Sequence, residues 1–232
     1  MANHAFQYGD HHKAEKLFID TIKKLVADGS PPDANAIIHI SGKLACLYAL
    51  VHDDQKAQEG FRFCTEILET KIKNGAKDFD TLALQSLILG WYGEFLYSRG
   101  NYEQSMDCFQ LSHSTSVEIN GPSHEQSVLQ LNNIAATLAS TGKMDSAITQ
   151  IKEVILLTEK EPTPESQQDL PCFYLNLANL YLRTEQISKA EESCRLSLKQ
   201  ARQVKNEEAI REAENCLKDI DKMKQSWMPN FV

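Results

Sequence analysis

Residues 43–61, KLACLYALVHDDQKAQEGF, contain two small residues, Ala45 and Ala57, at positions where bulky neighbours follow within one helical turn. Tyr48 follows the first small residue by three positions, and Phe61 follows the second by four. Two antiparallel helices that cross closely need small residues where their backbones approach, and bulky residues fill the flanking grooves. The stretch therefore predicts a pair of helices joined by a turn at Asp53-Asp54.

The same pattern occurs five times along the chain, at intervals of 42 to 48 residues. The first small residue of each unit is Ala2, Ala45, Gly93, Ala135 or Ala178, and the second, twelve positions later, is Ala14, Ala57, Ser105, Ala147 or Ala190. The bulky residue four positions further on is Phe18, Phe61, Phe109, Ile151 or Cys194. Ten small residues in one register indicate a structural repeat.

The repeats predict an all-α protein, a right-handed superhelical solenoid of about five helix pairs plus a C-terminal capping helix. Residues 1–225 are expected to form this one domain, and residues 226–232 a tail. The predicted repeats are 1–28, 34–74, 78–119, 123–160 and 165–204, followed by the capping helix 206–225. Each of the four gaps between the five predicted repeats contains glycine or proline, which supports the boundaries.

Composition excludes some classes of partner. The chain has 232 residues and a formal net charge of −8, which argues against nucleic acid, since phosphate contacts need clustered Lys and Arg. The most apolar run, residues 82–96, is interrupted by polar residues and glycines, so no transmembrane segment is expected. The first residues already resemble the middle of a helix, and neither a signal peptide nor a presequence is recognised. We therefore expect a fragment or processed form of a longer protein.

Neither the cysteines nor any motif predicts catalysis. Of six cysteines, Cys46, Cys64, Cys108 and Cys194 fall among apolar residues at helical spacing, so they are predicted to be reduced core residues rather than disulfide partners or metal ligands. No nucleotide-binding, zinc-protease or hydrolase motif occurs. The prediction is a non-enzymatic protein without cofactor or metal. A hydrolase or transferase with a solenoid body is kept as a third hypothesis, after the two protein-binding functions given below.

The first helix of each pair is expected to line a concave groove. Its inward positions are mostly neutral and apolar, without the Lys and Arg set that clamps a terminal carboxylate. Asparagines gather in the last two units, where their amides suit the backbone of an extended peptide; alternatively, they satisfy carbonyls between helices. The predicted protein-binding residues are His39, Glu94, Tyr97, Asn132, Asn133, Asn176, Asn179 and Arg183.

The pattern Leu44-Ala45-x-x-Tyr48 with Ala57-x-x-x-Phe61 resembles the tetratricopeptide repeat. Asn132-Asn133-Ile134-Ala135 resembles the corresponding stretch of kinesin light-chain repeats, where such asparagines face a cargo peptide. A cytosolic adaptor of that type, which holds extended peptides, is therefore the alternative hypothesis.

A closer resemblance is to the family of mitochondrial tetratricopeptide repeat protein 19. It is carried by residues 1–3 with 14–18, by residues 36–45 and by residues 63–69. Members of that family attach to the mitochondrial inner membrane, bind respiratory complex III, and support its assembly and the clearance of Rieske protein fragments. The resemblance implies the same localisation here, complex III subunits including the Rieske protein as partners, and no cofactor. Weak self-association through an apolar edge at Met1 is also expected.

Overall fold

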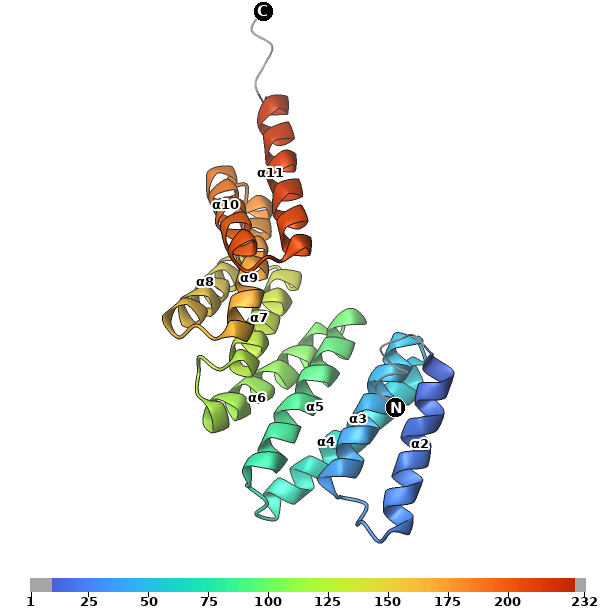
Figure 1. Cartoon of the computed structure of the whole chain (residues 1–232). Coiled ribbons are helices and arrows are strands. Elements are labelled where there is room, and N and C mark those ends of the chain that lie inside the picture. Colours follow the sequence, from blue (N-terminus) through green and yellow to red (C-terminus); the bar gives the residue numbers. More distant parts are fainter. Residues whose placement is uncertain (1–9, 228–232) are drawn as a thin grey trace, which may run out of the picture. The chain divides into compact units, whose positions relative to one another are not determined.

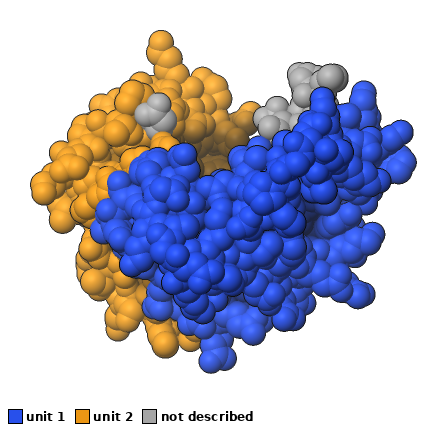
Figure 2. All heavy atoms as spheres, turned by 90° about the horizontal axis from the view of Figure 1, so that it is seen from below, with its two compact units in different colours: residues 1–119 blue, residues 120–232 orange. Residues whose placement is uncertain are grey.

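The computed structural model describes residues 10–227, which form ten α-helices and no strand (Figure 1). The prediction of an all-α fold is confirmed over this range. The chain divides into two compact units, residues 1–119 and 120–232 (Figure 2). This division falls between the third and fourth predicted repeats.

The helices are divided between the two units. The first unit contains α2 (His11–Ala27), α3 (Asn35–Leu50), α4 (Asp54–Lys73), α5 (Phe79–Ser98) and nearly all of α6 (Tyr102–Asn120). The second contains α7 (Glu125–Ser140), α8 (Met144–Lys160), α9 (Pro164–Arg183), α10 (Ile187–Gln203) and α11 (Glu207–Trp227). The predicted capping helix corresponds to α11, which continues two residues past its expected end. The first helix of the first repeat, the edge at Met1 and residues 228–232 lie outside the described residues.

The small residues lie where the helices of a pair cross. All nine of those described are buried: Ala14, Ala45, Ala57, Gly93, Ser105, Ala135, Ala147, Ala178 and Ala190. The Oγ of Ser105 donates to the carbonyl of Gly93 at 2.9 Å, so the backbone of α5 lies within reach of a one-carbon side chain on α6. A Cβ added to Gly93 would lie 2.6 Å from the ring of Phe109. The predicted close approach of the two helices is therefore present.

A second contact between the paired helices was not predicted. It lies seven residues before the first small residue and seven after the second, where a side chain of the second helix donates to a backbone carbonyl of the first. These bonds, 2.6 to 3.5 Å long, run from Cys64 to Ile38, from Ser112 to Ser86 and from Ser197 to Pro171. In the fourth pair Val128 and Val154 occupy the same positions, both buried. Each pair is thus fixed at two levels, which sets its crossing geometry.

The turns inside the helix pairs also recur at a fixed position of the repeat. The residue seven positions after the first small residue has a positive φ in four repeats: His52, Gly100, Gly142 and Glu185. The next amide then bonds back to a carbonyl of the preceding helix, for example Gln186 to Tyr181 at 2.8 Å. This geometry is the helix-ending motif in which a left-handed residue satisfies carbonyls that the helix leaves open. The turn therefore has the same backbone geometry in the four pairs whose turns are described.

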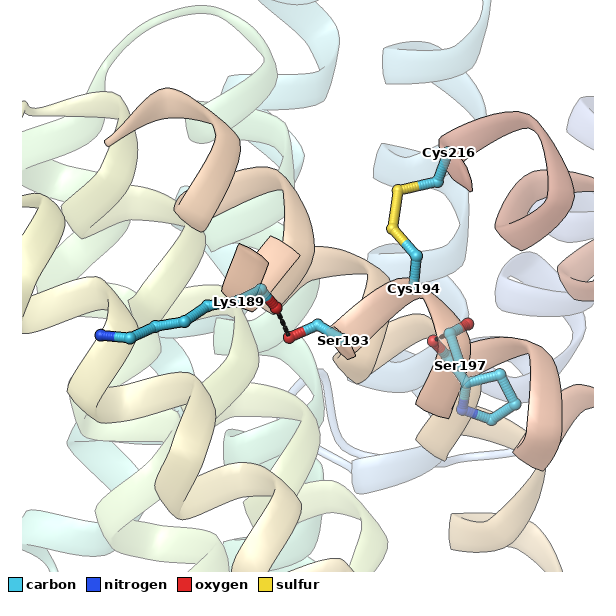
Figure 3. The surroundings of a disulfide bond; sticks show 6 residues. Lys189, Ser193, Cys194, Ser197 and Cys216 are labelled. Carbon is cyan, nitrogen blue, oxygen red and sulfur yellow. Dashed lines mark hydrogen bonds between the residues drawn. A yellow bond between two sulfur atoms is a disulfide. The ribbon is translucent and has the colours of Figure 1, made fainter. Parts of the chain in front are cut away.

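One cysteine prediction is wrong. Cys194 is buried as predicted, but it forms a disulfide with Cys216 of α11, and their Cα atoms are 6.2 Å apart (Figure 3). Helix α11 packs against α10 and brings Cys216 to it, although this position has no counterpart in the repeats. Cys46, Cys64 and Cys108 are free thiols, and burial raises the pKa of each to about 12. The capping helix is therefore covalently attached to the last repeat.

Replacing Gly93 with Ala should lower the free energy of unfolding by about 1–2 kcal/mol, measured by urea denaturation. The added methyl group would overlap the ring of Phe109, and overpacking of this kind outweighs the gain of about 1 kcal/mol in helix propensity. The double variant Gly93→Ala/Phe109→Ile reproduces the fourth repeat, which pairs Ala135 with Ile151. A double-mutant cycle should give a coupling energy of at least about 1 kcal/mol, and additive effects would contradict this packing.

Replacing both Cys194 and Cys216 with Ser should lower the free energy of unfolding by about 3 kcal/mol. The bond closes a loop between residues 22 positions apart, and opening it restores conformational freedom to the unfolded chain. Thermal melts of the wild-type chain with and without dithiothreitol should show a similar difference in the free energy of unfolding. Melts of the double variant should not respond to the reductant. A wild-type melt that is also insensitive would mean that the two thiols are not joined.

Candidate protein-binding site

The first helices of the two repeats in the second unit, α7 and α9, are joined by a pair of asparagines. The Nδ2 of Asn176 donates to the Oδ1 of Asn132 at 3.0 Å, and both side chains are half-buried. Each amide thus contributes one polar group to the bond between them. Among the described residues neither side chain makes a second hydrogen bond, so the Nδ2 of Asn132 and the Oδ1 of Asn176 can still bond to a ligand.

The repeat register explains why these two residues meet. Asn132 lies three positions before the first small residue of its repeat, and Asn176 lies two positions before that of the next. The same two positions in the first unit are Gly42 and Trp91, and a Cβ on Gly42 would lie 3.4 Å from the indole ring. The same pair of repeat positions therefore holds an indole packed against glycine in the first unit and two hydrogen-bonded amides in the second.

The other two predicted asparagines do not join this pair. Asn133 is half-buried, and its Nδ2 has no hydrogen-bond partner among the described residues. Asn179 lies on α9, one turn after Asn176, and is exposed. The predicted cluster of four asparagines thus contains one bonded pair and one exposed neighbour at its edge.

Arg183 has a structural contact that the sequence did not indicate. Its Nη2 donates to the carbonyl of Ala139 in the last turn of α7, at 3.0 Å. Arg99 makes the equivalent contact in the first unit, where its Nη2 donates to the carbonyl of Ala49 at 3.0 Å and the guanidinium pairs with Asp54 at 2.7 Å. Both arginines follow the first small residue of their repeat by five or six positions, and this recurrence is the signal that could have revealed their shared role.

The three remaining predicted residues lie on the inner helices of the first unit. His39 stacks on Trp91, with ring centroids 6.0 Å apart, and burial followed by the charge of Lys43 lowers the pKa of His39. The rings of Tyr97 and Tyr102 pack edge to face, with their centroids 5.4 Å apart. Glu94 is exposed, and its charge adds to burial in raising the pKa of Cys46. The predicted residues therefore form two surfaces, one in each unit.

The described residues offer little for chemistry. Within residues 10–227 no three His, Cys, Asp or Glu side chains are grouped as a metal ion would require. No helix in this range combines the length and the apolar character needed to span a bilayer. What the inner surfaces present instead is amide, aromatic and charged side chains, which suit the binding of another polypeptide.

No family model matches the chain. Curated proteins do: the Drosophila melanogaster tetratricopeptide repeat protein 19 homolog, mitochondrial, is 33% identical over 220 residues, which is 95% of this chain and 59% of that protein. The Homo sapiens tetratricopeptide repeat protein 19, mitochondrial, is 30% identical over 232 residues, which is 96% of this chain and 60% of that protein. The chain thus spans about three fifths of these relatives.

Solved structures match in fold. BtubC (BKLC) from P. vanneervenii has a TM-score of 0.69 at 15% identity, covering 95% of this chain and 93% of that one. A Podosopora anserina putative kinesin light chain with nearly identical TPR-like repeats has a TM-score of 0.63 at 15% identity, covering 88% and 92%. At such identities only the fold is shared. The chain has a tetratricopeptide-type fold, and over nearly all of its own length it is homologous to mitochondrial tetratricopeptide repeat protein 19.

Proposed function

We propose that this chain is part of a mitochondrial, inner-membrane-associated factor that binds respiratory complex III, including the Rieske protein, and acts without catalysis. Its role would be to support the assembly of the complex and the clearance of Rieske protein fragments. The observation that carries this proposal is the identity of 30 to 33% with proteins of one mitochondrial family, sustained over some 95% of the chain.

The surface that we assign to this role is the face shared by α7 and α9. It is centred on the amide pair of Asn132 and Asn176, in which the internal bond leaves the Nδ2 of Asn132 and the Oδ1 of Asn176 unused. An extended segment of a partner presents alternating backbone carbonyls and amides, and such a pair can bond to both. The asparagine side chains would then position a partner, while the core of each helix pair maintains the scaffold.

A cytosolic adaptor of the kinesin light-chain type remains the alternative. It is favoured by the fold shared with the Podosopora anserina repeats and by the asparagines of α7. The two functions require the same kind of surface but different partners. Identifying what binds therefore decides between them.

Deleting the gene in the organism that encodes this chain should lower ubiquinol–cytochrome c reductase activity and cause Rieske protein fragments to accumulate. The wild-type gene should restore both. The variant Asn132→Ala/Asn176→Ala should restore them poorly and should recover less complex III in affinity purification. Its free energy of unfolding should fall by no more than about 1 kcal/mol, because a half-exposed hydrogen bond contributes little to stability.

Gln104→Ala is the matched control, because it removes another amide–amide hydrogen bond, from Asn101, on an exposed surface of the first unit. It should behave like the wild type in every assay. Normal complex III in the deletion strain would refute the proposed function, and co-purified motor or vesicle proteins would favour the adaptor. A loss of several kcal/mol in the asparagine variant would show that the pair mainly holds the helices together.

A further inference from the structure

The face of α7 and α9 carries three residue pairs at a constant spacing, which we call the acidic, amide and basic rungs. Each rung pairs one residue of α7 with one of α9, and successive rungs are seven residues apart on both helices. The rungs are Glu125 with Asp169, Asn132 with Asn176, and Ala139 with Arg183. Seven residues make two turns of helix, so all three rungs lie on one face, about 10 Å apart.

The amide and basic rungs are joined by the hydrogen bonds described above. The acidic rung follows from the same register, because Glu125 precedes Asn132 and Asp169 precedes Asn176 by seven residues on their helices. Burial and then the charge of Glu125 raise the pKa of Asp169, which agrees with the placement of two carboxylates near each other in one rung. Within residues 10–227 no salt bridge or hydrogen bond is recorded for either of them.

Helix α11 adds negative charge beside the acidic rung. Burial raises the pKa of the Cys172 thiol, and so do the charges of Glu212, Asp169 and Glu208, in that order. Glu208 and Glu212 are exposed, and no salt bridge within residues 10–227 involves them. The acidic end of the face therefore combines carboxylates of α7, α9 and α11, held within the second unit.

The opposite end of the face is positive. One nitrogen of the Arg183 guanidinium is bonded to the carbonyl of Ala139, while the side chain is exposed and has further N–H groups. The face thus runs from negative, through a neutral amide pair, to positive over about 20 Å. An extended chain rises about 3.3 Å per residue, so six residues cover the same distance.

We propose that this face binds an extended segment of a partner protein that carries a Lys or Arg and, about six residues away, an Asp or Glu. The cationic side chain lies at the acidic rung, the anionic one at Arg183, and the backbone between them bonds to the amide rung. The proposal rests on the proposed function in one respect, that this face holds the partner. It adds the charge pattern by which a segment is selected.

Fluorescence anisotropy with labelled peptide pools tests the charge pattern on the whole chain. Each pool consists of nonapeptides with two fixed residues six positions apart, and Ser, Thr, Val and Ala are randomised elsewhere. The pool with Lys and Glu should bind about tenfold more tightly than pools with two Lys or two Glu, and its affinity should fall as salt screens the charges. Equal binding by all pools, or a preference for two Glu, would overturn the proposal.

Variants of the acidic rung locate the effect. Glu125→Gln/Asp169→Asn should reduce the affinity for the Lys and Glu pool about tenfold and leave a pool with Gln and Glu unchanged. Glu192→Gln, an exposed carboxylate on α10, is the control and should change neither affinity. Thermal melts by circular dichroism establish that all variants are folded. An unaltered affinity in the folded double variant would refute the role of the acidic rung.

The outcome is separable from that of the proposed function. Complex III that co-purifies with the wild-type chain, together with peptide pools that show no charge preference, would refute only this inference. A deletion strain with normal complex III, together with the expected charge preference, would refute only the identity of the partner.

Discussion

Two helices can bring their backbones together only where both residues at the crossing are small, and this chain meets that requirement once in every repeat. The buried hydroxyl of Ser105 on the carbonyl of Gly93 shows how close the approach is. Bulky residues one turn away then fill the space beside the crossing, as Phe61 does next to Ala45 and Ala57. Because van der Waals contact falls off steeply with distance, a larger residue at the crossing would separate the helices along their length.

The second level of contact makes this arrangement tolerant of sequence change. Its side chains are a cysteine, serines and valines, and each donor on the second helix bonds to a backbone carbonyl of the first, although the hydroxyls of Ser86 and Ser112 also lie 3.1 Å apart. A carbonyl is present whatever the residue, so the first helix can carry Ile38, Ser86 or Pro171 at that position. Because contacts between its own two helices stabilise each pair, the residues between the first helices of successive pairs can differ from repeat to repeat. The same backbone register therefore presents an indole against glycine in one unit and an amide pair in the other.

The fold could be predicted because its signal is repeated, whereas most of the site could not. Five copies of one register predict the helix pairs, and the asparagines are visible in the sequence as a cluster. The bond between Asn132 and Asn176 depends on how neighbouring repeats are offset, which a single helix pair does not specify. The disulfide joins a repeat position to Cys216, which has no equivalent in the repeats and hence no predictable geometry. The second contact level was missed because it has no constant residue type.

The charge order on the α7 and α9 face agrees with the direction of the helices that carry it. The hydrogen bonds between α7 and α9 link residues in the same order along both helices. The two helices therefore run parallel, and their dipoles add. Glu125 lies in the first turn of α7 and Glu208 in the first turn of α11, while Arg183 lies in the last turn of α9. Each charge thus faces the helix end that stabilises it, typically by 0.3–1 kcal/mol. Carboxylates without cationic partners can be kept there at little cost to folding. A face polarised in this way before a partner arrives needs little rearrangement on binding, so more of the interaction energy appears as affinity.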